Sequence, residues 1–505
     1  MTPDIFRILP EVVLTLTGVL VMLLDAALPK ATLRRPLGWV AAFGVMAALW
    51  ASLWQLGLSP GTGFYGTVQS DAFSVFFHVL ICGIVLAALL LSLDTLPADV
   101  HHPGEYYALI VFGSVGMCLL TSAVELLLVF IALEISSIAT YVLAGYRKNN
   151  AKGPEAAIKY FLLGSFATGF LLYGVAMVFG ATGTTQINEI AALLPSAHEH
   201  SLVIIAFALL MVGILFKVSA APFHVWTPDV YEGSPTPAVA LMSTAPKAAA
   251  FALLLRVVYE LFPSLHTLWH PLLWVVAVLS MTVGNLAALR QENVKRMLAY
   301  SSIAHAGYLL AAFAGLGANS IAAAAFYTAA YAAMNVGIFA VITLVGGYDE
   351  AHPMIADYKG LIYRTPLLGS LLIFFLVSLV GIPFTGGFFG KFYSFSAAVD
   401  GGAVVLAIIG LLNSGLAAAY YLRFALTAAK RTETSAQPAR HTPEIGIAVG
   451  ASLLLSVAAT LCLGIVPNEV LHAAESAAHT LQIPPAPVLN SDPAPGVSTA
   501  PPLQP

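Results

Sequence analysis

The sequence predicts an all-α membrane protein that crosses the bilayer about fourteen times. Of its 505 residues, 59% are hydrophobic and only 9% are charged, whereas soluble chains carry roughly 25% charged residues. Long apolar stretches recur at the length that suits a hydrocarbon core of about 30 Å. Basic residues gather in alternate loops, as expected for one side of a membrane. Lipid is therefore the expected solvent and we expect no nucleic-acid partner. The net charge of −4 itself says nothing about partners, because the charges are segregated by side of the membrane.

Most of the predicted spans are apolar runs of about 20 residues. The fourth and fifth runs are nearly fused. The spans cover residues 8–28, 37–57, 72–93, 104–122, 124–145, 155–180, 202–226, 236–260, 270–289, 294–316, 320–345, 366–399, 402–426 and 445–465.

The basic residues orient these spans. If the N-terminus is periplasmic, every Lys and Arg of the loops between spans falls on the cytoplasmic side. We therefore expect a multi-pass protein of the bacterial inner membrane with both termini in the periplasm. The residues concerned are Lys30, Arg34, Arg35, Arg147, Lys148, Lys152, Lys159, Arg290, Lys295, Arg296, Lys359, Arg364, Arg423, Lys430, Arg431 and Arg440.

Four basic residues lie within apolar spans instead: Lys217, Lys247, Arg256 and Lys391. A lysine at bilayer depth costs about 2.5–3.5 kcal/mol, so it indicates a partner or a wet cavity. Lys247 is about 16 Å into its span, near the midplane, which predicts a functional role. Arg256 is nearer the end of the same span, so we expect its side chain to reach the interface and to be structural.

Glu134 is the one acidic residue at the centre of a predicted span. A carboxylate at that depth needs a nearby cation to stay charged. Either it serves ion transport, or it forms a structural ion pair between two helices.

The histidines lie singly on different spans, which argues against a haem held by paired axial ligands. We interpret His78 as a packed neutral side chain. His305 suits proton exchange at neutral pH. The three cysteines, Cys82, Cys118 and Cys462, are far apart in apolar segments. Their spacing offers no zinc or cluster site, so we expect small buried side chains and no metal or cofactor in this chain.

Two spans are too long to be ordinary helices. Residues 202–226 would measure ~37 Å, and Pro222 predicts a break near Ala220–His224. Residues 366–399 would measure ~51 Å, with GIPFTGGFFGK at their middle. Unwound backbone is tolerated in a membrane where it is buried in protein or lines a watery cavity. A phosphate-binding loop is excluded because Thr385 replaces a required glycine and Phe392 follows the lysine.

The two breaks are five spans apart, which suggests two five-helix repeats related by inversion. The expected organisation is three N-terminal helices, a first repeat, a second repeat, a last helix and a Pro-rich tail that we expect to be disordered. These regions are 1–103, 104–260, 261–426, 427–466 and 467–505.

Several motifs are distinctive together: FIALEISSIATYVLAGY, STAPKAAAF, QENVKRMLAYSSIAHAGY and GIPFTGGFFGKFY. They resemble the proton-translocating membrane subunits of respiratory complex I, which are relatives of Mrp-type sodium/proton antiporter subunits. Lysine at position 391, and no long helix after Ile465, favour the subunit N type.

The resemblance implies fourteen helices, two inverted repeats and two broken helices. It implies a proton relay containing the charge pair Glu134 and Lys217, the central Lys247 and the terminal Lys391. Lys159 and His305 match further family positions, and His224, beside the first break, is another candidate.

The implied activity is NADH:quinone oxidoreductase, with proton translocation in this chain and redox chemistry elsewhere. FMN, iron–sulfur clusters and quinone would belong to partner subunits, and the neighbours would be M-like and K-like membrane subunits. The alternatives are a cation/proton antiporter subunit, a membrane-bound hydrogenase subunit and a purely structural scaffold.

Overall fold

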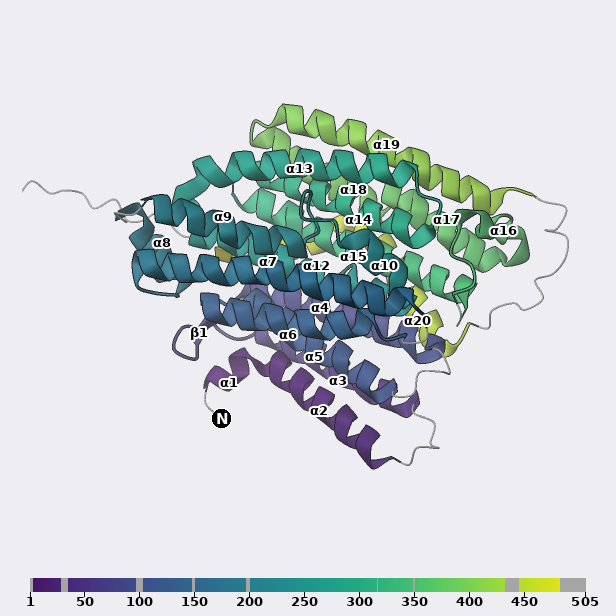
Figure 1. Cartoon of the computed structure of the whole chain (residues 1–505), viewed down its shortest axis with the longest axis horizontal. Coiled ribbons are helices and arrows are strands. Elements are labelled where there is room, and N and C mark those ends of the chain that lie inside the picture. Colours follow the sequence, from purple (N-terminus) through teal and green to yellow (C-terminus); the bar gives the residue numbers. More distant parts are fainter. Residues whose placement is uncertain are drawn as a thin grey trace, which may run out of the picture.

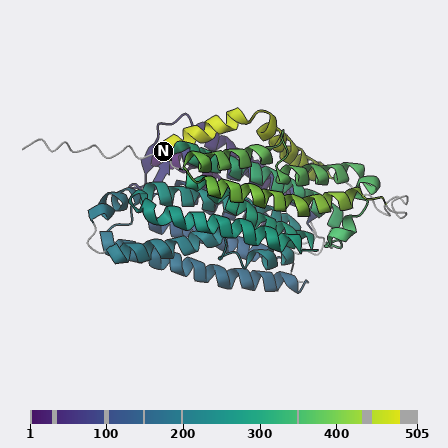
Figure 2. The ribbon, with the colours of Figure 1, turned by 90° about the horizontal axis from the view of Figure 1, so that it is seen from above.

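The computed structural model describes residues 3–28, 35–96, 103–147, 150–196, 200–315, 317–347, 350–431 and 445–481. Predictions for Lys30, Arg34, Lys148, Arg440 and the tail from residue 482 onward lie outside the described residues. The long helices run side by side in one bundle, with α2 at one edge and α19 at the other (Figure 1). Figure 2 shows the same side-by-side arrangement from above.

Thirteen helices in the described part of the chain are long and apolar enough to cross a membrane. The pair α17 and α18 occupies the remaining predicted span, so the all-α membrane class is confirmed. The number of crossings and the inverted repeat remain predictions. The helices are α2 (Leu9–Ala27), α3 (Arg35–Gln55), α4 (Ala72–Thr95), α5 (Pro103–Ser122), α6 (Leu126–Ala144), α7 (Lys152–Thr182), α9 (His200–Lys217), α11 (Thr236–Met242) with α12 (Ala245–Arg256), α13 (His266–Leu289), α14 (Val294–Ala311), α15 (Ala318–Gly346), α17 (Pro366–Val380), α18 (Gly386–Asp400), α19 (Val404–Ala429) and α20 (Ile447–Ile465).

Short elements connect them. They are α1 (Pro3–Arg7), β1 (Gly61–Gly63), β2 (Val68–Ser70), α8 (Ile187–Leu193), η1 (Leu194–Ser196), α10 (Thr227–Gly233), η2 (Val257–Leu261), η3 (Pro263–Leu265), η4 (Ala312–Ala314), η5 (Ile355–Tyr358) and α16 (Leu361–Arg364). The strands β1 and β2 pair antiparallel, and Arg7 fixes this hairpin to the N-terminus by donating to Gly61 O over 2.7 Å.

Both breaks inferred from length are present. Helix α9 ends at Lys217, and α10 begins only at Thr227. Between α17 and α18, the backbone turns through Gly381 and Phe384, whose φ angles are 94° and 69°. A positive φ at Phe384 is a strained conformation that the surrounding packing must hold.

The span predicted over 236–260 is present as Thr236–Leu261, but it is not one continuous helix. Helix α11 ends at Met242, α12 begins at Ala245, and a π-helical turn over Val257–Leu261 follows. Pro246 explains the interruption, because proline has no N–H and its ring clashes with the carbonyl four residues earlier. Lys247 consequently lies in the first turn of a helix.

The expectation of disorder over 467–505 is wrong for its first part, because Pro467–Leu481 forms helix α21. Ala474, Ala477 and Leu481 are buried, and the helix packs on α4 and α15. This spacing places the three side chains on one helical face, a signal that the sequence contained. In Figure 2, α21 (yellow) lies at the edge of the bundle.

Candidate functional site

Lys217 is held by α6 at the point where α9 stops. Its Nζ donates to Ser137 Oγ over 2.7 Å and to Tyr141 Oη over 3.4 Å. Glu134 is one turn from Ser137, on the same face of α6. Its Oε1 is buried without a hydrogen-bond partner among the described residues. The two predicted partners are therefore neighbours, but Lys217 bonds to Ser137 rather than to Glu134.

Lys247 is buried, with 3% of its surface exposed, and the contacts that the structure gives it are uncharged. Its Nζ donates to Ser302 O over 3.0 Å and also to Ser302 Oγ. Tyr331 donates to the same Oγ over 2.7 Å. Asn335 then donates to Tyr331 Oη over 3.0 Å, so Lys247 begins a polar network between α12, α14 and α15.

The second break supplies the partners of Lys391. Its Nζ donates to Leu379 O over 3.0 Å, to Val380 O over 2.8 Å and to Ser414 Oγ over 2.8 Å. The last carbonyls of α17 lack intrahelical partners and form the negative end of the helix dipole, which favours a cation. A pocket of about 390 Å³ adjoins this lysine and includes Asp400 in its lining.

His305 lies between these two lysines on α14. Tyr327 Oη is 2.9 Å from its Nδ1, and Tyr421 Oη is 3.1 Å from its Nε2. Ser302, the partner of Lys247, comes three residues before His305. Tyr308, whose ring centre is 5.0 Å from Lys391 Nζ, comes three residues after it. Residues three apart share one face of a helix, so α14 presents a polar row from one lysine to the other.

Two weaker candidates are not part of this row. Lys159 is half-exposed and pairs with Asp229 over 2.7 Å and with Glu155 over 2.8 Å. His224 is partly buried in the first break, and its Nδ1 has no hydrogen-bond partner among the described residues.

The charged cluster around Lys159 joins α7, α10 and α14. Arg296 pairs with Asp229 over 2.7 Å and with Glu232 over 2.9 Å, and Lys152 pairs with Glu232 over 2.7 Å. Burial acts to raise the pKa of both carboxyl groups, but the hydrogen bonds from these basic residues lower each pKa below its usual value. Basic residues from loops predicted to share one side of the membrane therefore do meet at one end of the bundle.

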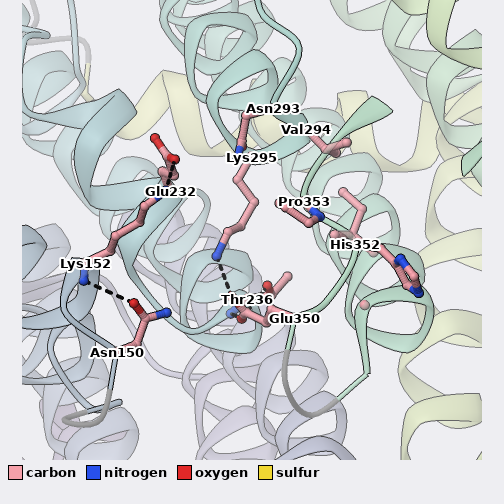
Figure 3. A pocket seen from close by; sticks show the side chains of 12 residues that line it. Asn150, Lys152, Glu232, Thr236, Asn293, Val294, Lys295, Glu350, His352 and Pro353 are labelled. Atoms are coloured by element: carbon pink, nitrogen blue, oxygen red, sulfur yellow. Dashed lines mark hydrogen bonds and ion pairs between the residues drawn. The ribbon is translucent and has the colours of Figure 1, made fainter. Parts of the chain in front are cut away.

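A neighbouring pocket of about 210 Å³ contains Glu350, a residue that the sequence analysis did not single out. Figure 3 shows Lys295 pointing toward Glu350 and Thr236, across from Lys152. Glu350 pairs with Lys295 over 2.8 Å and accepts the backbone N–H of Thr236 over 2.6 Å. Burial would raise its pKa, but Lys295 and Thr236 lower the pKa below the usual value. Nothing local to position 350 indicates this partnership.

The expectation that Arg256 reaches the interface is wrong. The residue is fully buried, with 0% exposure. It donates to both oxygens of Asp71 over 3.1 and 3.0 Å, to both oxygens of Glu260 over 3.0 Å, and to Thr121 O over 2.9 Å. The end of α12 packs between the start of α4 and the end of α5, which closes the route to solvent.

The expectation that all three cysteines are buried also needs correction. Cys462 is exposed on α20, although Cys82 and Cys118 are buried as expected. His78 is buried, as expected of a packed side chain, and its Nε2 lies 3.3 Å from Oε1 of Glu11, a second acidic residue buried within an apolar helix. The described residues contain no group of three or more His, Cys, Asp or Glu side chains placed to hold a metal ion.

Comparisons with known proteins agree with this architecture. Residues 123–417 match the family model described as NADH:quinone oxidoreductase/Mrp antiporter, TM. NADH-quinone oxidoreductase subunit N 2 of Koribacter versatilis is 50% identical over 488 residues, covering 95% of this chain and 98% of the relative. The chain belongs to the NADH–quinone oxidoreductase subunit N family.

Solved structures extend the comparison. A chain of respiratory complex I from Thermus thermophilus with bound aureothin has a TM-score of 0.78 at 35% identity, covering 92% of this chain and 99% of that one. A chain of the Mrp complex from Dietzia shares the fold, with a TM-score of 0.82 at 22% identity over 95% and 98% of the two chains.

Proposed function

We propose that this chain is the proton-translocating, N-type subunit in the membrane arm of an NADH–quinone oxidoreductase, with Glu134, Lys217, Lys247, His305 and Lys391 as its proton relay. The observation that carries the relay is the polar row on α14. Ser302 bonds to Lys247, His305 follows one turn later, and Tyr308 lies against Lys391.

In the proposed cycle, a change in a neighbouring subunit alters the field at Glu134, which favours or disfavours the charged form of Lys217. Lys217 bonds to the neutral side chain of Ser137. Its proton can therefore leave without the breaking of a direct ion pair. The effect passes to Lys247, then along the hydroxyl groups beside His305 to Lys391. The pocket beside Lys391 gives the proton its way out to the periplasm.

The free energy comes from partners. FMN, iron–sulfur clusters and quinone belong to the other subunits of the proposed enzyme, and M-like and K-like membrane subunits flank this chain. The protein lies in the bacterial inner membrane with both termini periplasmic, which the positive-inside bias of its loops supports. Lys159 and His224 are the weaker candidates for members of this relay.

A cation/proton antiporter subunit is the second candidate, because the Mrp-complex chain shares the fold. Sodium flux in reconstituted vesicles separates the two functions. Flux that requires Na⁺ and no NADH would favour the antiporter.

The decisive variant is Lys247→Ala. We expect proton pumping and quinone reduction to fall together while the complex still assembles, because a buried cation with uncharged partners has no evident structural role. Lys430→Ala, at an exposed lysine after α19, is the matched control. Full coupled activity in the Lys247 variant would refute the relay.

A further inference from the structure

A second pair of buried ionisable side chains lies among the N-terminal helices, outside both predicted repeats. Glu11 of α2 is 3% exposed and His78 of α4 is 1% exposed. The His78 Nε2 is 3.3 Å from Glu11 Oε1 and 2.9 Å from Ser122 Oγ. It also lies 3.1 Å from Cys118 O, so α5 completes the site.

The hydrogen-bonding capacity of this pair is only partly filled. The Glu11 carboxylate has the His78 Nε2 at 3.3 Å and the Ser122 hydroxyl as its polar neighbours, without a well-aligned hydrogen bond to either oxygen, and the Nδ1 of His78 has no hydrogen-bond partner among the described residues. An unpartnered buried polar group is costly, and an unpartnered buried carboxylate is more so. A proton on Glu11, or one shared with His78, lowers that cost directly.

The Arg256 cluster (Arg256, Asp71 and Glu260) adjoins the pair through α5. Arg256 donates to Thr121 O, and the next residue, Ser122, bonds to His78. The thiols of Cys82 and Cys118 also lie close to this site, and Cys118 interacts with Glu11.

The Arg256 cluster and the Glu11–His78 pair together contain more carboxylates than basic side chains. Asp71, Glu260 and Glu11 are three carboxylates, whereas Arg256 and His78 supply at most two positive charges. One carboxylate is therefore unbalanced even when His78 is charged. Because an uncompensated buried charge is strongly destabilising, the site as a whole favours binding one proton. One imidazole beside one carboxylate is too few ligands for a metal ion, so the proton is the fitting ligand.

We propose that Glu11 and His78 form a proton-binding site that is separate from the lysine row and exchanges one proton during turnover. On loading, one proton from water binds a Glu11 oxygen and is shared with the His78 Nε2 3.3 Å away. On unloading, that same O–H or N–H bond breaks and the proton returns to water, so that no other bond changes. Helix α12 connects the two systems, since it carries Lys247 in its first turn and Arg256 at its end. Through this shared helix, charging of Lys247 changes the electrostatic field at the Arg256 cluster and at Glu11. The inference thus rests on the proposed function.

The test uses the intact complex with Glu11→Gln and, separately, His78→Gln, which keep side-chain size and remove the titratable group. Glu469→Gln, at an exposed position of α21, is the matched control. The readouts are protons pumped per electron, the pH profile of pumping, and the carboxyl region of the redox-induced infrared difference spectrum. We expect both variants to pump fewer protons per electron than the control with a displaced pH profile, and Glu11→Gln to lose one carboxyl signal.

Wild-type pumping, pH profile and infrared signal in both variants would overturn the proposal. Failure of both variants to assemble would assign the pair to folding and would overturn it too. The lysine relay is judged separately: if Lys247→Ala pumps normally, the relay fails, whatever the Glu11 variant does.

Discussion

Replacing Arg256 by Met tests how far the buried ion cluster holds α4, α5 and α12 together. The guanidinium is 3.0 Å from a carboxylate on either side, and no part of it reaches solvent. Deleting one partner of a buried ion pair costs about 3–5 kcal/mol, because the remaining charge is left unpaired. Each 1.4 kcal/mol changes an equilibrium constant tenfold. The population of locally opened molecules should therefore increase by a factor between about one hundred and several thousand.

The two buried cysteines report this opening. In a Cys462→Ser background, the remaining thiols, Cys82 and Cys118, react with a maleimide only when their surroundings open. When closing is faster than labelling, the labelling rate follows the open population, so Arg256→Met should accelerate it by the same factor.

Two controls separate charge from packing. Arg256→Lys keeps the charge but not the paired hydrogen bonds, and should fall between wild type and the Met variant. Adding Asp71→Asn and Glu260→Gln to Arg256→Met removes the stranded charges and should slow labelling again. Wild-type labelling in the single Met variant would refute the reasoning.

Other single positions give equally direct tests. Burial acts to raise the pKa of Glu350, but the ion pair with Lys295 outweighs it and lowers the pKa below the ordinary 4.5. The pair therefore stabilises the fold above pH 4.5, and this stabilisation is lost as the pH falls through the folded-state pKa. Glu350→Gln should therefore flatten acid unfolding curves, and an unchanged curve would contradict this. Gly387→Ala places a methyl group against Ser378 O and should destabilise the protein by about 1–3 kcal/mol in denaturant unfolding, whereas Gly83→Ala meets nothing within 4 Å. Equal stabilities would show that the second break is loosely packed. Glu134→Gln should reduce pumping more than Glu134→Asp, because charge rather than shape acts on Lys217; equal rates would indicate a hydrogen-bonding role.

The sequence by itself determined the solvent, the apolar spans and the two interruptions that lie in overlong spans. These properties are local: apolar length against bilayer thickness locates a span, and a proline with glycines inside an overlong span marks a break. The same reasoning found Lys247 and Lys391, because a cation at bilayer depth stands out without knowledge of its neighbours. The interruption before Pro246 was missed although the proline is plain in the sequence, because the span that contains it has an ordinary length.

Only the tertiary structure decided which side chains meet. Lys217 bonds to Ser137, Glu350 pairs with Lys295, and Glu11 contacts His78. The partners in these three pairs are 55 to 80 residues apart in the sequence. Arg256 shows the reason most clearly. Its distance from the end of the span predicted a side chain in contact with the interface, yet the ends of α4 and α5 enclose it and supply a carboxylate and a carbonyl. Depth within a span is a property of one helix, whereas burial depends on which other helices pack against it.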